Sequence, residues 1–180
     1  MNVLVCGGAG FIGSEFIRNH LKNNSDSKLT NLDILTIGSN LQNLKNIENN
    51  PNYSFIKENI TNESIIDGIV KDVDVIVNFA AESHVDRSIS NPKPFLETNI
   101  MGTYSILEAV RKYDKKFIHV STDEIYGDAY GQDSFDEESQ INPSNPYAAT
   151  KAAADNLVAS YHRTYGINCI ITRCTNNFGP

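Results

Sequence analysis

Short apolar segments alternate with longer amphipathic segments along this chain of 180 residues. Six segments have the composition of β-strands, and several are unbroken apolar runs; they comprise residues 2–6, 28–33, 53–56, 73–79, 116–121 and 167–173. Unbroken apolar strands are typical of parallel sheets, because both faces of such sheets are buried. Five further segments space their apolar residues as helices do: 11–23, 40–47, 63–71, 94–113 and 147–165. The alternation predicts an α/β fold with a doubly wound parallel sheet.

The composition limits the functions that such a fold could serve. The net charge is −7 and no basic stripe is present, which argues against binding to nucleic acid or to an anionic membrane. The three cysteines form neither a CxxC pair nor a metal-ligand pattern, so we expect a protein of the reducing cytoplasm without a metal site. No apolar run approaches the roughly 20 residues of a membrane helix, and the N-terminus lacks the features of a signal peptide.

A glycine-rich stretch, VLVCGGAGFIG, follows the first predicted strand and contains Gly7, Gly10 and Gly13. Between a strand and a helix, such glycines let the backbone approach a pyrophosphate at the positive N-terminus of the helix. Asp33 ends the second predicted strand, where a carboxylate can bind a ribose diol. Its charge would repel a 2′-phosphate and no arginine follows it, so the sequence favours NAD over NADP. The alternative is a turn that serves only close packing, with Asp33 as a helix cap.

A second motif, PYAATKAAAD, places Tyr147 and Lys151 on one face of a predicted helix. The pKa of a tyrosine phenol is ordinarily about 10, too high for a base at neutral pH. An ammonium group one turn away, together with a positively charged nicotinamide, would stabilise the phenolate and lower that pKa. Tyr147 could then take a proton from a sugar hydroxyl held by Ser121 or Thr122, while hydride leaves the same carbon. The same spacing also occurs by chance on exposed helices.

Taken together, these motifs resemble the short-chain dehydrogenase/reductase superfamily, in its extended branch that acts on nucleotide sugars. Within that branch the chain is most similar to the dTDP-glucose 4,6-dehydratases. The resemblance covers the whole chain, and its most specific parts are AAESHVDRS and STDEIYGD. It implies a Rossmann-like sheet, NAD as cofactor and a nucleotide sugar as substrate. Further matching stretches are LDILTIGSNLQNL, ETNIMGTYSILEA and NNFGP.

The stretch STDEIYGD places Asp123 and Glu124 at the tip of the fifth predicted strand. Two adjacent acids in a loop usually form only a solvated turn. In a dehydratase, however, oxidation at C4 of the sugar acidifies the C5 proton, and loss of water across C5 and C6 needs a base and an acid. The resemblance implies that Asp123 is the acid, Glu124 the base and Thr122 a hydrogen-bond donor to the C4 oxygen. Paired carboxyl groups can divide these roles when one is protonated and the other ionised.

The resemblance also assigns residues to the two ligands. The expected catalytic residues are Thr122, Asp123, Glu124, Tyr147 and Lys151. The expected cofactor contacts are Gly7, Gly10, Phe11, Ile12, Gly13, Asp33, Ile34, Leu35, Thr36, Asn59, Ile60, Phe79, Ala80, Ala81, Ser83, Thr98, Tyr147, Lys151 and Asn177. The expected substrate contacts are Ser83, Thr122, Asp123, Glu124 and Asn176. We assign no chemistry to His84, Asp86 and Arg87.

Three features depart from the family pattern. Asn59 stands where the family usually has an aspartate beside the adenine, although its amide oxygen can still accept a hydrogen bond. Arg173 occupies a position that is more often asparagine. Family members also continue well beyond NNFGP, and that remainder supplies most of the substrate domain. We therefore expect residues 1–180 to form an NAD-binding Rossmann-type domain that lacks the C-terminal substrate domain and turns over sugar nucleotide poorly.

The sequence thus predicts NAD-dependent dehydration of dTDP-glucose to dTDP-4-keto-6-deoxyglucose. Two alternatives stay open: a non-catalytic NAD-binding module, and a UDP-sugar epimerase or decarboxylase of the same superfamily. Family members form dimers through two helices that correspond to residues 94–113 and 147–165, so we expect a homodimer. A face of small residues could allow close approach there, or could equally pack on the sheet; it comprises Ala148, Ala149, Ala152 and Ala153.

Overall fold

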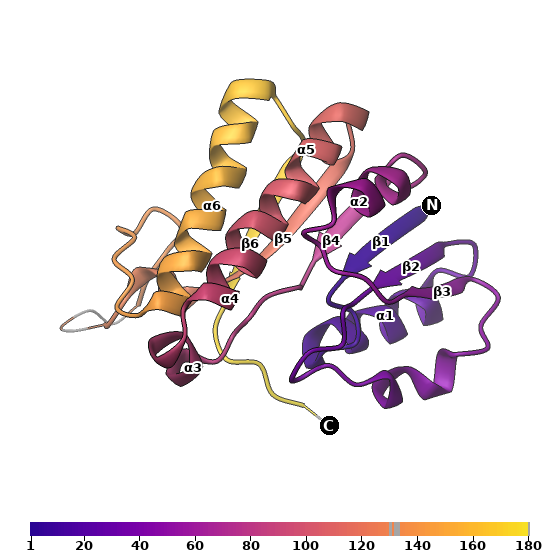
Figure 1. The fold of residues 1–180 in the computed structure, drawn as a ribbon, viewed down its shortest axis with the longest axis horizontal. Coiled ribbons are helices and arrows are strands. Elements are labelled where there is room, and N and C mark those ends of the chain that lie inside the picture. Colours follow the sequence, from indigo (N-terminus) through magenta and orange to yellow (C-terminus); the bar gives the residue numbers. More distant parts are fainter. Residues whose placement is uncertain (130, 132–133, 180) are drawn as a thin grey trace.

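The computed structural model describes residues 1–129, 131 and 134–179. Pro180, the last residue of the NNFGP motif, lies outside the described residues. Six parallel strands form one sheet in the order β3-β2-β1-β4-β5-β6 (Figure 1). The order reverses between β1 and β4, which is the arrangement of a Rossmann fold. The predicted α/β class and parallel sheet are confirmed. The strands are β1 (Asn2–Cys6), β2 (Lys28–Leu32), β3 (Tyr53–Ile56), β4 (Val75–Asn78), β5 (Lys116–Thr122) and β6 (Cys169–Cys174).

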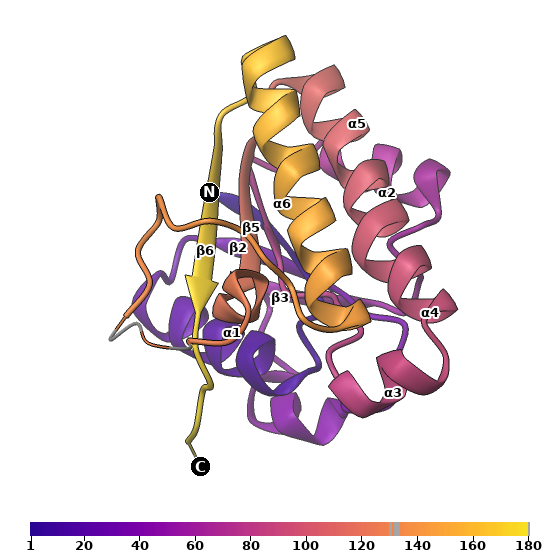
Figure 2. The same cartoon turned by 90° about the vertical axis from the view of Figure 1, so that its left-hand side faces the viewer.

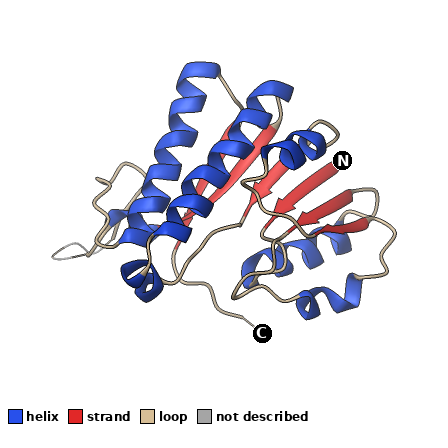
Figure 3. Cartoon of the chain, viewed as in Figure 1, coloured by secondary structure: helices blue, strands red, loops and turns tan. Residues whose placement is uncertain are grey.

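Helices cover both faces of the sheet (Figure 3). One face packs against α2 (Glu63–Val70), α5 (Thr103–Tyr113) and α6 (Pro146–Tyr165). The other packs against α1 (Phe11–Asn23) and the short 3-10 helix η1 (Leu41–Ile47).

The side chains of β1 show how the two cores are separated. Leu4 belongs to the core under α2, α5 and α6, whereas Val3 and Val5 belong to the core under α1. Successive side chains of a strand point to opposite faces, so a strand that is apolar throughout fills both cores. The same unbroken apolar pattern in the sequence predicted a parallel sheet.

The predicted helix over residues 94–113 is divided in the structure. It consists of α4 (Lys93–Phe95), a π-helical segment η2 (Leu96–Gly102) and α5. The wide π turn coincides with close packing at Gly102, where an added Cβ would collide with the side chain of Ile60. Such π segments often occur at functional sites. Two short helices, α3 (Val85–Ser90) and η3 (Asp123–Tyr126), were not predicted because they are too short to show periodicity.

The predicted face of alanines on α6 is also divided. Ala148 and Ala152 are buried within the chain, whereas Ala149 is exposed and Ala153 is half-buried. Ala152 packs with Ile125 of η3, so part of this face positions a turn of the same chain. Within the described residues, no helix combines the length and the apolar character that crossing a membrane requires.

Two helical glycines, Gly68 and Gly102, give a matched test of the close packing between Gly102 and Ile60. Gly68 of α2 has open space around an added Cβ, whereas Gly102 faces Ile60. We expect Gly68→Ala to raise the free energy of unfolding by up to about 1 kcal/mol, through helix propensity. Gly102→Ala should lower it by about 1–3 kcal/mol, because the methyl group overfills the core. Urea denaturation measures both; equal effects of the two substitutions would contradict the packing described for Gly102.

Candidate functional site

A cavity of about 530 Å³ opens beside the segments that follow the carboxyl ends of β1, β2, β4, β5 and β6. Ligands of doubly wound sheets bind at this edge, at the point where the strand order reverses. All of the predicted cofactor, substrate and catalytic residues line the cavity except Leu35 and Asp123. Ser121, the alternative to Thr122 for holding a sugar hydroxyl, also lines the cavity. The sequence missed other residues of the lining: Leu32, Ile37, Gly38, Ser39, Glu58, Glu82, His84, Val120, Cys174 and Thr175.

The glycine turn brings bare backbone to this cavity. Gly7 has φ +77°, and an added Cβ would lie 2.5 Å from the amide nitrogen of Ala80, so the turn packs tightly against the segment after β4. Gly10 differs, because its added Cβ would meet only the Gly7 carbonyl oxygen, at 3.4 Å. Gly10 lines the cavity and precedes the first turn of α1 without a side-chain cap. The positive end of α1 therefore faces the cavity through a position that has no side chain.

Asp33 organises the backbone on the other side of the turn. Its carboxylate is buried and accepts hydrogen bonds from the backbone amides of Ala9, at 3.0 Å, and Leu35, at 2.8 Å. Ser39 donates a third, at 3.2 Å. Leu35 was predicted to contact the cofactor, but it does not line the cavity; with φ +62° it turns back so that its amide reaches Asp33.

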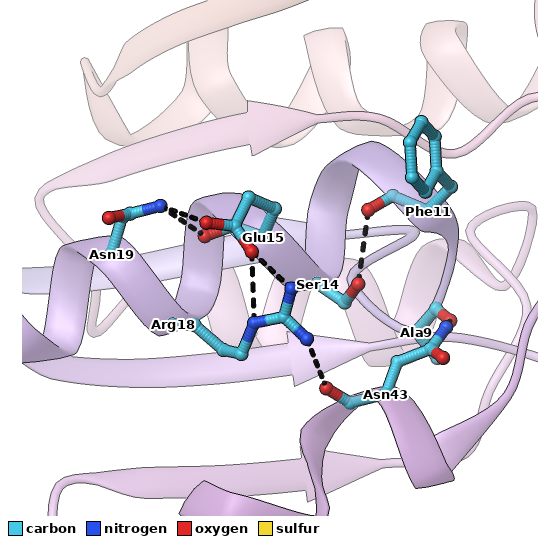
Figure 4. Close-up of polar contacts among 7 residues, drawn as sticks. All are labelled: Ala9, Phe11, Ser14, Glu15, Arg18, Asn19 and Asn43. Carbon is cyan, nitrogen blue, oxygen red and sulfur yellow. Dashed lines mark hydrogen bonds and ion pairs between the residues drawn. The ribbon is translucent and has the colours of Figure 1, made fainter. Parts of the chain in front are cut away.

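The segment η1 fixes the glycine turn in place, which the sequence did not indicate. The side-chain amide of Asn43 donates to the carbonyl oxygen of Ala9 at 3.1 Å, and the backbone amide of Asn40 donates to the same oxygen at 2.9 Å. Figure 4 shows Arg18 of α1 reaching across to the carbonyl oxygen of Asn43, at 2.9 Å. Asn43 lies in an asparagine-rich stretch, and nothing in the sequence distinguishes it from its neighbours.

Asn59 keeps part of its predicted capacity to bind a ligand. It lines the cavity, and its side-chain oxygen accepts a hydrogen bond from the backbone amide of Thr61 at 3.0 Å. A carbonyl oxygen has two lone pairs, so it can accept a second hydrogen bond. The next residue, Ile60, packs against Gly102 and forms an apolar wall of the cavity.

Helix α6 carries Tyr147 and Lys151 into the cavity. Asn145 caps the helix, because its side chain accepts a hydrogen bond from the Ala148 amide at 2.8 Å. The backbone amide of Tyr147 donates to the hydroxyl of Ser88 in α3, at 3.1 Å. Lys151 is buried, and its Nζ donates to the carbonyl oxygen of Val120 in β5, at 2.8 Å.

The loop after β4 is tied to the same helix by Asn99 of η2. Its side chain accepts from the backbone amide of Glu82 at 2.9 Å and donates to the Glu82 carbonyl oxygen at 3.0 Å. It also donates to the Thr150 hydroxyl of α6 at 2.9 Å. One buried amide therefore sets the distance between the loop that lines one wall of the cavity and the helix that lines the other.

The pKa of Tyr147 differs from the expectation drawn from the sequence. Burial raises the pKa of its phenol to about 12, and the charges of Glu124 and Asp123 act in the same direction. Hydrogen bonding with Thr122 acts the other way. Burial lowers the pKa of Lys151 to about 8, so its ammonium group is still mostly protonated at neutral pH. In the protein alone the phenol pKa is therefore raised and not lowered, and the combined effect of Lys151 and a bound nicotinamide stays a prediction.

The two acids begin η3 directly after β5. The Glu124 amide donates to the Thr122 hydroxyl at 3.3 Å, and that hydroxyl donates to the Asp123 carboxylate at 3.4 Å. Glu124 lines the cavity and accepts from the side-chain amide of Asn145 at 3.3 Å. Asp123 lines a second cavity, of about 1040 Å³, which shares Glu124 and Thr175 with the first. Both carboxylates are close enough to Tyr147 to raise its pKa.

Comparison with known proteins identifies the family. The model of the GDP-mannose 4,6 dehydratase family matches residues 4–180. The chain belongs to this family. It is 49% identical over 181 residues to the low-salt glycan biosynthesis protein Agl12 of Haloferax volcanii, and 47% identical over 185 residues to a dTDP-glucose 4,6-dehydratase of Streptomyces niveus. Both matches cover the whole chain, which spans only 58% and 55% of these two relatives.

Solved structures give the same result for the fold. The chain matches the dTDP-glucose 4,6-dehydratase of Bacillus anthracis in complex with NAD with a TM-score of 0.92 and 45% identity. It matches the UDP-glucuronic acid 4-epimerase of Bacillus cereus in complex with NAD with a TM-score of 0.92 but 32% identity. The matches cover all of this chain, and 56% and 58% of the two structures. The family fold is thus shared by enzymes of different activity.

Burial of Lys151 makes a prediction about stability. Its pKa in the folded chain, about 8, lies below the ordinary 10.5, so the unfolded chain binds this proton more tightly. Protonated Lys151 therefore destabilises the fold below pH 8, by up to about 3 kcal/mol, and stability should rise between pH 8 and 10.5 as the unfolded state alone holds the proton.

Lys151→Met should unfold at a higher Tm than the native chain at pH 7. The difference in Tm between the two proteins should narrow as the pH rises from about 8 to 10.5. Lys22→Met, at an exposed lysine of α1, serves as the control. A difference in Tm that is independent of pH would contradict the lowered pKa.

Proposed function

We propose that this chain binds NAD in the cavity at the sheet edge and supplies the catalytic groups for the dehydration of a nucleotide-activated hexose such as dTDP-glucose. The observation that carries the proposal is the position of Asp123 and Glu124 beside Tyr147 at the end of β5. The identity of 45% or more to dTDP-glucose 4,6-dehydratases supports it.

The residues at the sheet edge fit NAD. A diphosphate would lie against Gly10 and the first turn of α1, where an added side chain would enter the cavity. Asp33 would hold the adenosine ribose, and its charge disfavours the 2′-phosphate of NADP. Asn59 and Ile60 would border the adenine, and Tyr147 and Lys151 the nicotinamide half. When bound, NAD supplies the hydride acceptor for sugar oxidation and later the hydride donor that completes the reaction.

In this proposal, Tyr147 removes the proton of the C4 hydroxyl, and Thr122 orients that hydroxyl by hydrogen bonding. A phenol with a pKa of about 12 is a weak acid, so Tyr147 needs additional positive charge close by before it can act as a base at neutral pH. Glu124 then takes the C5 proton, and Asp123 donates a proton to the departing C6 hydroxyl. Both carboxyl groups line the second cavity, and Glu124 alone also lines the first.

The alternatives are less well supported. Epimerases are among the structural neighbours, but at 32% identity, compared with 45% for the dehydratase of B. anthracis. An epimerase that only exchanges hydride at C4 has no use for an acid and a base acting at C5 and C6. A non-catalytic NAD-binding module remains a distinct proposal for residues 1–180 taken alone, because the chain spans little more than half of its curated relatives. We expect this part of the chain to bind NAD but to turn over sugar nucleotide slowly.

A homodimer through α5 and α6 forms a further part of the proposal. The two helices lie side by side on one face of the molecule (Figure 2). Met101 at the start of this surface and Ala149 on α6 are exposed and apolar. Two such helices from each subunit can pack as a four-helix bundle. Light scattering at tens of micromolar, a concentration at which a stable dimer of this kind persists, should give twice the monomer mass; a monomer would contradict the proposal.

Substitution of the two acids tests the reaction. Asp123→Asn and Glu124→Gln should each lower the rate of 4-keto-6-deoxy sugar formation by about 10²–10⁴-fold. Asp123→Asn should let NADH or the 4-keto sugar accumulate, because oxidation precedes the step that it blocks. NAD affinity, measured by calorimetry on the 180-residue chain, should not change.

The matched control is Glu138→Gln, which removes an exposed carboxylate from the loop that follows η3. It should leave the rate unchanged. An epimerase would keep its full rate with Asn at position 123, and that result would refute the dehydratase proposal.

A further inference from the structure

Arg173 of β6 contacts both halves of the catalytic site without lining the cavity that holds Tyr147 and Lys151. Its Nε donates to the Asp155 carboxylate at 3.0 Å, and its Nη1 donates to the Tyr126 hydroxyl at 2.8 Å. Asp155 lies one helical turn beyond Lys151 on α6. Tyr126 ends the 3-10 turn η3, which begins with Asp123 and Glu124. The Arg173 guanidinium therefore connects α6, which carries Tyr147, to η3, which carries Asp123 and Glu124.

We propose that Arg173 is a positioning residue that holds the turn carrying Asp123 and Glu124 against α6 and keeps Asp155 ionised beneath Lys151. This inference rests on the proposed function of the site, because positioning has a consequence only if these groups act together.

The contacts on the side of η3 fix the end of the turn at several points. Besides the hydrogen bond to Tyr126, Nη1 donates to the carbonyl oxygen of Glu137 at 3.2 Å. The guanidinium lies 5.3 Å from the centroid of the Tyr126 ring, within the range of a cation–π interaction. The other face of Tyr126 stacks on Phe135, with the ring centroids 5.2 Å apart. Arg173 thus joins η3 and the segment around Glu137 to the edge strand β6.

The contacts on the side of α6 concern charge. Asp155 is only 2% exposed, and burial raises its pKa. Hydrogen bonding with Ser121, then the hydrogen bond from Arg173 and the charges of Lys151 and Arg173, oppose that rise. His119 of β5 lies 3.6 Å from the other carboxylate oxygen but gives no positive charge, because burial holds its pKa well below 6.5. Arg173 is thus a permanent cation next to a carboxylate that would otherwise be protonated more readily.

Asp155 in turn acts on Lys151. The titratable groups that face the Lys151 ammonium are Asp155 on α6, Cys174 on β6 and the uncharged His119 on β5. The negative charge of Asp155 raises the pKa of Lys151 against the larger effect of burial. Loss of the Asp155 charge would therefore let the pKa of Lys151 fall below about 8. The effect passes from Arg173 to Lys151 through Asp155, since Arg173 makes no direct contribution to the pKa of Lys151.

The two roles can be separated by substitution. Arg173→Lys keeps a positive charge beside Asp155. A lysine cannot hydrogen-bond to Asp155 and Tyr126 at once in the planar geometry of a guanidinium. Arg173→Gln removes the charge as well. Arg111→Gln is a matched control, because Arg111 also forms an ion pair, with Glu108 at 2.8 Å, and lies 4.8 Å from the centroid of the Tyr165 ring, but on the outer face of α5.

The first measurement is the titration of Lys151 by NMR on the 180-residue chain labelled with ¹³C at lysine Cε, with the signal assigned by its loss in Lys151→Met. The titration midpoint in Arg173→Gln should fall by about 1 pH unit, whereas Arg173→Lys and Arg111→Gln should keep the native midpoint. If Arg173→Gln does not fold, Asp155→Asn gives the same readout. An unchanged midpoint in the folded variant that is measured would overturn the proposed link to Lys151.

The second measurement is kcat for 4-keto-6-deoxy sugar formation. Arg173→Lys should lower kcat by about 10-fold or more with little change in NAD affinity, because it releases η3 while it keeps the charge. Tyr126→Phe should lower kcat in the same direction, and the double variant should be no worse than Arg173→Lys alone. Additive losses, or an unchanged kcat, would overturn the positioning role. The NMR titration does not depend on dehydratase activity, so failure of the proposed function and failure of this inference are distinguishable.

Discussion

Helix α6 buries a row of polar side chains, and this burial determines how the rest of the site is built. Tyr147, Lys151 and Asp155 follow one another at intervals of one turn, and all three are buried against the sheet. A buried polar or charged group is costly unless it is hydrogen-bonded. Each of them therefore has an assigned partner: Thr122 for Tyr147, the Val120 carbonyl oxygen for Lys151, and Arg173 for Asp155. All three partners belong to β5 or β6, so the edge of the sheet and the helix must be in register for the site to exist.

This requirement explains why so many contacts of the site run between elements that are distant in the sequence. Asn99 links the loop after β4 to α6, and the hydroxyl of Ser88 accepts from the backbone amide of Tyr147. On the cofactor side, Asn43 holds the glycine turn, and Asp33 holds the amide of Ala9. These bonds keep backbone and side chains at the cavity in a fixed geometry before any ligand binds. A pre-organised site loses less entropy when its ligand is bound.

The sequence predicted the parts of this structure that depend on local pattern. The bounds of β1, β3 and α1 agree with the predicted segments residue for residue, because each has an unbroken apolar run or a clear helical period. The π-helical division of residues 94–113 could not be predicted, since it accompanies the contact between Gly102 and Ile60, which are 42 positions apart in the numbering of the chain. The turn η3 was missed because four residues are too few to show a period.

The same distinction between local sequence pattern and long-range contacts applies to the site. Nearly all of the residues that the motifs named line the cavity, because the motifs follow the carboxyl ends of strands that meet at one edge of the sheet. Asn43 and Asp155 were missed although both lie in stretches that resemble the family, because their contacts with Ala9 and Arg173 appear only when distant segments are brought together. Arg173 was recognised as a departure without a consequence. In the structure it has one, because it lies between Asp155 and Tyr126.

The raised pKa of Tyr147 has a mechanistic meaning beyond the failure of a sequence-based expectation. With a pKa of about 12, the phenol stays protonated at neutral pH, and the neighbouring carboxylates Asp123 and Glu124 strengthen that state. The same carboxylates would attract a positively charged group into the cavity, and such a group would oppose their effect on the phenol. If Tyr147 is the base that we propose, it becomes competent when a positive charge in the site opposes the effects of burial and of the two carboxylates on its pKa.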